Sequence, residues 1–224
     1  MMGSVIGEIL PLALGVAISP IPVIAAILML LSPKARITSV GFLLGWMIGI
    51  VVAVTVFSLL FSILPEHDPD ASRPIRGTVQ LVLGLLLFLL AFVQWRKRPK
   101  PGEEAALPKW MKAIDTFTFP VAFGLGFMLA AVNPKNLTMA AGAGTDIGVA
   151  ALPAGSTTLV VIVYVLVASS TVLVPVVGYL IAAERLRAPL NALSTWLTSE
   201  NTVIMAVLFV VLGTSMIGKG IGSF

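Results

Sequence analysis

Lys135 is the residue of this sequence whose charge and position are best suited to chemistry. Its positive side chain lies within an apolar stretch, 117–143, that is long enough to cross a membrane. An ammonium at the centre of a spanning helix costs about 2.5–3.5 kcal/mol on insertion scales, so it should face a cavity or a partner. We therefore expect Lys135 to attract an anionic headgroup or carboxylate. The alternative is that its side chain reaches out to the membrane surface.

Two short proline motifs define the candidate site. Lys135 lies in Asn133-Pro134-Lys135-Asn136, and the first apolar stretch contains Ser19-Pro20-Ile21-Pro22. A proline inside a helix removes a backbone hydrogen bond and clashes with the preceding turn, so both stretches should break near mid-membrane. The N-terminus of a half-helix presents N–H groups and a positive dipole end, which suit anions. The alternative is that these prolines only bend the helices. The predicted substrate-binding residues are Ser19, Pro20, Pro22, Asn133, Pro134, Lys135 and Asn136.

Signatures of other chemistry are missing from the sequence. The chain has no cysteine, which excludes disulfides and thiolate metal sites. It has no His-Glu-x-x-His zinc motif and no Walker phosphate loop, and neither Ser19 nor Thr138 has a histidine nearby to activate it. We expect no catalytic residue, no bound metal and no cofactor, so the protein should not be an enzyme. Asp146 could relay a proton, but it follows the fourth apolar stretch, where a loop carboxylate would only be solvated.

The composition requires a membrane. Of the 224 residues, 58% are hydrophobic and 11% are charged, whereas soluble domains average about 45–50% and about 25%. A spanning helix needs about 20 apolar residues. We therefore expect an all-α integral membrane protein with six transmembrane helices. The candidate spans are roughly 5–32, 38–64, 75–95, 117–143, 155–183 and 202–220.

The two halves of the chain repeat. Superposing Pro20 on Pro134 also superposes the spans of 1–95 on those of 117–224, and residues 96–116 form a basic cytoplasmic linker between them. Each half has three helices, an odd number, so the second half enters the membrane from the opposite side. This predicts two inverted three-helix repeats with helices one and four broken at the proline motifs, an architecture common among secondary transporters.

Lysine and arginine are divided unevenly between the two sides. Ten lie in the loops after the first, third and fifth spans, and three lie on the opposite side, and an excess of positive charge marks the cytoplasm. Both termini should therefore lie outside. The basic loop after the third span should bind anionic lipid headgroups rather than nucleic acid. The ten are Lys34, Arg36, Arg96, Lys97, Arg98, Lys100, Lys109, Lys112, Arg185 and Arg187, and the three are Arg73, Arg76 and Lys219.

The sequence resembles the lysine-exporter (LysE) superfamily, and within it the actinobacterial GAP branch of glycolipid- and sulfolipid-addressing proteins. The resemblance rests on Ser19-Pro20-Ile21-Pro22, on the run from Leu28 to Arg36, and on Asn133-Pro134-Lys135-Asn136-Leu137. As a six-helix pattern it extends over nearly the whole chain. It implies export or flipping of an envelope lipid or glycolipid in the plasma membrane of a bacterium, and it is compatible with a homodimer. The related thiol-reductant transporters use a cysteine in each half, which this chain lacks.

The leading hypothesis is an exporter or flippase of an anionic lipid or glycolipid, with membrane lipids as partners and no nucleic acid. A second hypothesis is an exporter of small solutes such as amino acids or metal ions. Such a pathway usually needs polar lining, and few charges besides Lys135 lie within the spans. A third hypothesis is a scaffold that assists a separate lipid-export machine, for which no cavity at the proline breaks would be needed.

Overall fold

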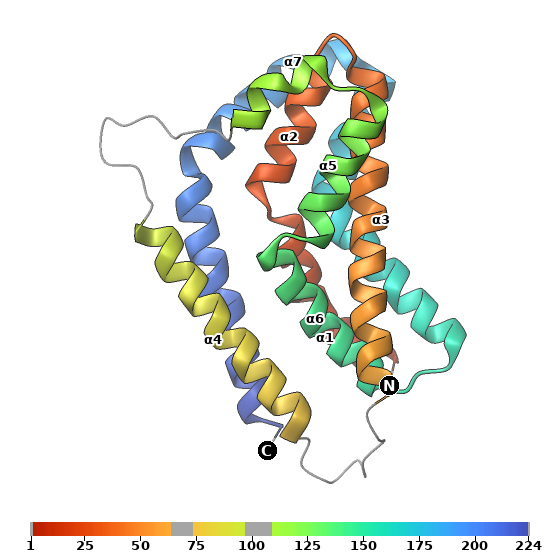
Figure 1. Cartoon of the computed structure of the whole chain (residues 1–224), viewed down its shortest axis with the longest axis vertical. Coiled ribbons are helices and arrows are strands. Elements are labelled where there is room, and N and C mark those ends of the chain that lie inside the picture. The colour runs from red at the N-terminus through yellow and green to blue at the C-terminus, as the bar shows by residue number, and fades with distance from the viewer. Residues whose placement is uncertain (1, 64–73, 97–108, 224) are drawn as a thin grey trace.

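The computed structural model describes residues 2–63, 74–96 and 109–223, and this part of the chain is helical with short connections. Figure 1 shows the helices packed side by side as one elongated bundle. The helices are α1 (Met2–Ala17), α2 (Pro20–Leu31), α3 (Ala35–Ser62), α4 (Pro74–Arg96), the 3₁₀ helix η1 (Lys109–Thr116), α5 (Phe119–Ala131), α6 (Pro134–Val149) and α7 (Ala154–Ile221).

The two predicted helix breaks are present. α1 ends at Ala17 and α2 begins at Pro20, and the two helices differ in direction by 54°. α5 ends at Ala131 and α6 begins at Pro134. The residue before a proline is pushed out of the helical region, and both Ser19 and Asn133 have extended backbones. Proline then fits the first helical position, where no N–H bond is lost.

The helices that suit a membrane are fewer than the six expected spans. Among the described residues, α3, α4 and α7 are long and apolar enough to cross a membrane, and the bent pair α1–α2 makes a fourth when it counts as one span. α5 is apolar but has only 13 residues. The protein is therefore an all-helical membrane protein by the length and composition of its helices.

α7 contains both of the last two predicted spans. It continues for 68 residues from Ala154 to Ile221, although a separator was expected over 184–201. Its backbone leaves the helical region at Ala182, with φ −141° and ψ 54°, and there it kinks. Figure 1 shows its first part rising from the end of the bundle where the chain termini lie, and its second part returning to that end beside α4. We call this end, which contains Met2 and Ser223, the terminal end.

Glycines allow α3 to approach the pair α5–α6 closely. On α3 they recur every fourth residue, and each faces a backbone carbonyl of α5. A Cβ added to Gly41 or to Gly49 would lie 2.9 Å from such a carbonyl oxygen. This stripe of small residues therefore serves close packing of the helices. The pairs of glycine and carbonyl are Gly41 with Phe119, Gly45 with Phe123, and Gly49 with Phe127.

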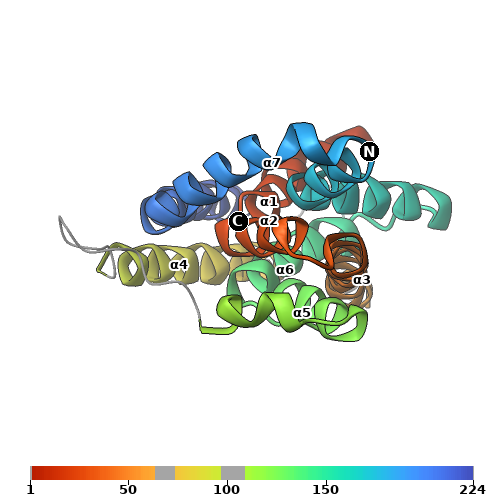
Figure 2. The same cartoon turned by 90° about the horizontal axis from the view of Figure 1, so that it is seen from above.

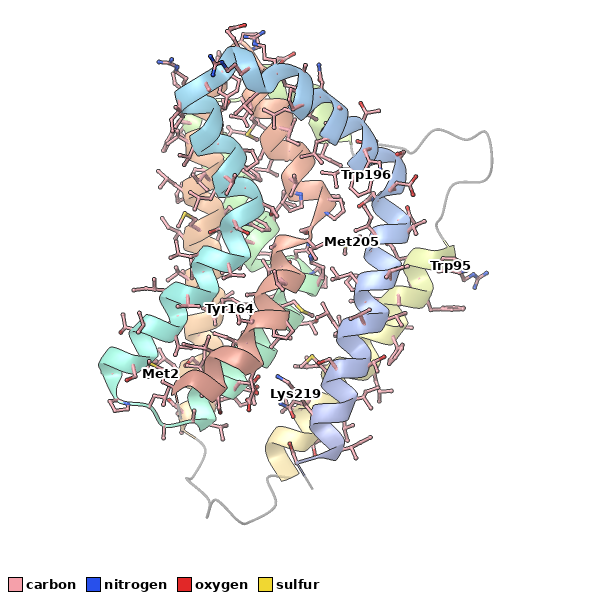
Figure 3. All side chains as sticks on the ribbon, turned by 180° about the vertical axis from the view of Figure 1, so that it is seen from behind. Met2, Trp95, Tyr164, Trp196, Met205 and Lys219 are labelled. Carbon is pink, nitrogen blue, oxygen red and sulfur yellow. The ribbon has the colours of Figure 1, made fainter. Side chains whose placement is uncertain are left out.

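The broken helices occupy the middle of the molecule. Viewed from above, α7 and α5 lie on opposite faces, with α1, α2 and α6 between them (Figure 2). Away from the terminal end, Trp95 and Trp196 are exposed, as is usual for aromatic side chains at a membrane surface. Figure 3 shows both of them, with Met2 and Lys219 at the terminal end. The basic cluster of the expected linker, Lys97 to Lys100, lies outside the described residues.

Candidate functional site

Lys135 lies at the start of α6, and its ammonium reaches the end of α1. Nζ donates to the carbonyl oxygens of Gly15 at 2.7 Å and of Ile18 at 3.3 Å. The last carbonyls of a helix have no partner inside the helix, and a cation there also meets the negative end of the helix dipole. The Lys135 side chain is buried, 4% exposed, and in the described part of the chain no carboxylate pairs with it. We call the meeting point of α6 with the end of α1 the junction.

Side chains from the second half of the chain form hydrogen bonds with backbone groups at the broken helix ends. Asn133 is the N-cap of α6, and its Oδ1 accepts from the Lys135 N–H at 3.0 Å. Asn136 donates from Nδ2 to the Leu129 carbonyl near the end of α5, at 2.8 Å. On α7, the Thr171 hydroxyl donates to the last carbonyl of α1, that of Ala17, at 2.7 Å. The predicted site residues Asn133, Lys135 and Asn136 therefore come together, and each stabilises a helix end.

The N-terminus of α2 is a poorer anion site than the sequence suggested. Pro20 and Pro22 have no N–H to offer, and the N–H of Val23 is bonded to the Ser19 carbonyl. Ser19 is buried at the N-cap position but makes no side-chain cap. The positive character of the junction therefore rests on the Lys135 ammonium rather than on helix N–H groups.

Asn136 brings an unused acceptor to the junction. Its Oδ1 is buried without a hydrogen-bond partner, and the residue is only 2% exposed. Buried polar atoms are nearly always paired, so each exception needs an explanation. A ligand that donates a hydrogen bond would satisfy this oxygen. The junction thus offers one cation and one acceptor, which suits a headgroup with an anionic oxygen and hydroxyl groups.

A second polar cluster lies at the terminal end, and sequence reasoning missed it. The expectation that Asp146 is a solvated loop residue is wrong, because Asp146 lies within α6 and its side chain is 1% exposed. Its Oδ2 is 3.4 Å from Lys219 Nζ, and its Oδ1 accepts from Gln80 Nε2 at 3.1 Å. Ser223 donates from its hydroxyl to Gln80 Oε1 at 3.3 Å. We call Gln80, Asp146, Lys219 and Ser223 the terminal cluster.

One sequence signal could have found this cluster. Lys135 and Asp146 are eleven residues apart, which is about three helical turns, so they share one face of α6. Extending the fourth span to Val149 would have placed the carboxylate on the same helix face as the ammonium. No comparable signal in the sequence indicated Lys219, which lies 73 residues after Asp146 in the chain. Among the described residues, no group of three or more acidic, His or Cys side chains could hold a metal ion.

Comparison with known proteins identifies the family. The model of the family described as Sap, sulfolipid-1-addressing protein, matches residues 9–222, which include both helix breaks and three residues of the terminal cluster, Gln80, Asp146 and Lys219. No curated protein and no solved structure matches the chain. The match confirms the sulfolipid-addressing part of the resemblance drawn from the proline motifs. The chain therefore belongs to the sulfolipid-1-addressing protein family.

Proposed function

We propose that this protein is a transporter or flippase that exports an anionic lipid or glycolipid to the cell envelope, without chemically changing it. The family name supports a lipid as the substrate, and the word sulfolipid indicates a sulfated, hence anionic, headgroup. The apolar surface of the long helices supports a route on which the acyl chains stay in the bilayer. Exposed side chains such as Leu59, Leu85 and Ile181 are typical of lipid-facing helices.

The observation that carries the proposal is the buried ammonium of Lys135. It lies between two broken helices, and its hydrogen-bond acceptors are the neutral carbonyls of Gly15 and Ile18. Neutral carbonyls do not cancel a full positive charge, so the ammonium still attracts an anionic oxygen, and this attraction is stronger in the protein interior than in water. The free acceptor of Asn136 adds a place for a headgroup hydroxyl.

We further propose that the chain crosses the plasma membrane six times as two inverted three-helix repeats, with both termini outside. Packing between the halves supports this arrangement. α3 of the first half packs on the broken pair α5–α6 of the second half. The first part of α7 is the counterpart of α3 in the second half, and α7 packs on the broken pair α1–α2 of the first half. The third helix of each half also fits, because the returning part of α7 lies beside α4.

A scaffold without transport activity is the second candidate, and one observation favours it. Asn133, Lys135 and Asn136 all bond to backbone groups of the protein itself. A site used only for architecture would look the same. An exporter of small polar solutes is weaker, because apolar residues dominate the buried surface around the breaks.

Lipid movement between leaflets of proteoliposomes tests the proposal. Lys135→Glu should nearly abolish movement of an anionic lipid, and Lys135→Met should do the same without placing a carboxylate against the α1 carbonyls. Lys135→Arg should retain part of the activity, because charge survives while geometry changes. Alanine at Ser19 or Asn133 should slow transport less, since each change removes at most one neutral hydrogen bond, worth about 0.5–1.5 kcal/mol.

Lys34→Met is the matched control, because Lys34 is an exposed lysine at the end of the bundle opposite the terminal end. It should be dispensable for lipid movement. Thermal stability has to be measured for each variant. If well-folded Lys135→Met moves lipid as fast as the parent, the ammonium takes no part in transport. If the parent itself moves no lipid, the scaffold becomes the leading candidate.

A further inference from the structure

Lys135 and the terminal cluster lie along one continuous seam between α1, α6 and the second part of α7. Along α6 the seam contains Lys135, Met139, Gly142 and Asp146, which are three or four residues apart and share a helix face. α1 reaches both ends of the seam, with the Gly15 carbonyl at Lys135 and the Glu8 carbonyl at Lys219. The seam therefore leads from the buried ammonium to the terminal end.

An apolar layer closes the seam between the two charged groups. Leu12 of α1, Met139 of α6, and Leu212 and Met216 of α7 are each less than 5% exposed. They pack over two glycines, because a Cβ added to Gly15 would lie 2.6 Å from Leu212 Cδ1 and 2.9 Å from Met139 Sδ. At Gly142 the corresponding distances are 2.8 Å to Met216 Cε and 3.2 Å to Leu12 Cδ1.

The terminal cluster holds this layer shut. Lys219 lies one turn beyond Met216 on α7, and Asp146 lies one turn beyond Gly142 on α6, so their ion pair joins the two helices that carry the layer. Lys219 also donates to the Glu8 carbonyl at 2.9 Å, which ties in α1. Gln80 adds α4 through its bond to Asp146. Separation of α6 from α7 at this end requires the ion pair to break.

The ion pair lies at the boundary between the protein interior and water. The Asp146 side chain is 1% exposed and the Lys219 side chain is 27% exposed, so water reaches the pair from the ammonium side. A carboxylate that binds a proton loses its charge and can donate one hydrogen bond. The attraction for Lys219 then falls, while the ammonium keeps its charge and becomes available to another anion.

We propose that Asp146 is a proton-binding site of this protein, and that its protonation releases Lys219 and opens the seam between α1, α6 and α7 toward the terminal end. The proton comes from water at the terminal end and forms an O–H bond on the Asp146 carboxylate. The released Lys219 ammonium is the second cation on the path, after Lys135, that an anionic headgroup meets.

The charged groups that the structure describes near Asp146 come from two helices. Among the described side chains of α1, α3 and α4, which pack against α6, and of α7, which reaches Asp146 through its side chains, Glu8 on α1 and Lys219 on α7 are the charged groups near this end. α3 has only uncharged residues from Ile37 to Ser62, and Lys135 is three turns away on α6 itself. Among these described groups, a response to pH at this end is assigned to Asp146, and a Glu8→Gln variant checks the contribution of Glu8.

That the opened seam serves an anionic headgroup rests on the proposed transport function, but opening of the seam can be measured without lipid movement. The chain has no cysteine, so Met216→Cys creates a single reporter within the apolar layer. Met29→Cys is the matched control, because Met29 is equally buried in α2, outside the seam. The full chain in lipid nanodiscs is treated with a membrane-impermeant thiol reagent, and modification rates are compared between variants at the same pH, which cancels the change in thiolate fraction.

At neutral pH, Asp146→Asn should raise the modification rate of the Met216→Cys reporter by about tenfold, within the usual range of coupling between two sites. As the pH falls, the rate with native Asp146 should approach that of Asp146→Asn. Lys219→Gln should give the high rate at every pH, and it carries the test if Asp146→Asn does not fold. The Met29→Cys control should keep its low rate throughout.

Equal reporter rates with native Asp146 and with Asp146→Asn at every pH would overturn the proposal. So would a parallel rise at Met29→Cys, because the ion pair would then only stabilise the whole fold. A responsive reporter in a protein that moves no lipid would leave the proton site standing and contradict the transport function. Lipid transport with an unresponsive reporter would contradict the proton site alone.

Discussion

The close crossing of α3 and α5 predicts a specific loss of stability. A Cβ at Gly45 would collide with the backbone carbonyl of Phe123, and backbone cannot move aside as a side chain does. Overpacking costs about 1–3 kcal/mol, and we take the upper value because both partners are helix backbone. Alanine gains about 1 kcal/mol over glycine in a helix. Gly45→Ala should therefore lose about 2 kcal/mol, which corresponds to roughly 4–8 °C in a domain of this size.

Gly124→Ala is the matched control, because an added Cβ at Gly124 of α5 has no atom within 4 Å. It changes glycine to alanine in an apolar helix of the same crossing and should keep or slightly raise the melting temperature. Thermal unfolding in a mild detergent measures both variants, and Gly126→Ala should behave like Gly45→Ala because its Cβ would meet the Phe42 carbonyl. If Gly45→Ala and Gly124→Ala melt together, the two helices are not held at backbone contact and the packing argument fails.

Three further predictions concern polar groups and topology. Thr171→Val should lower stability by about 0.5–1.5 kcal/mol in thermal unfolding, because the Ala17 carbonyl loses one of its two donors and keeps only the Ser19 N–H. Tyr164→Phe should leave stability unchanged or raised in the same assay, since the buried Tyr164 hydroxyl has no partner to lose; a clear loss would reveal a bond within the fold. If both termini lie outside, Ser223→Cys should react with a membrane-impermeant thiol reagent in intact cells, whereas Lys100→Cys should not. The opposite pattern of labelling would show that the topology is inverted.

The sequence was sufficient for features that depend on local backbone chemistry. Pro20 and Pro134 determine where the helices break, because the restriction that proline places on its neighbour acts wherever the chain lies. The glycine stripe on α3 was equally readable, since residues four apart share a helix face. Asn133 also behaves as its type suggests, because a cap needs only the next few residues.

Features that depend on partners far along the chain could not be predicted. Nothing near Lys135 in the sequence indicates that its ammonium would bond to carbonyls 117 and 120 residues away. Asp146 was misplaced because glycine-rich residues 142–148 have weak helix propensity, and only packing against α3 explains why α6 continues through them. A surface helix was predicted from Arg185 to Glu200, between the last two spans, and the segment is helical, but it is continuous with both parts of α7.

The donors at the end of α1 impose an order on biosynthesis. The Gly15 carbonyl accepts from Lys135, which is 120 residues later in the chain, and the Ala17 carbonyl accepts from Thr171, 154 residues later, in addition to the nearby Ser19 N–H. At about 5–20 residues per second, roughly 6–30 s pass between synthesis of the acceptor and of its donor. During that interval the first helix pair is incomplete, so water or the insertion machinery must cover its exposed carbonyls. α1 is synthesised first, and its final packing therefore has to wait until α6 and α7 have been synthesised.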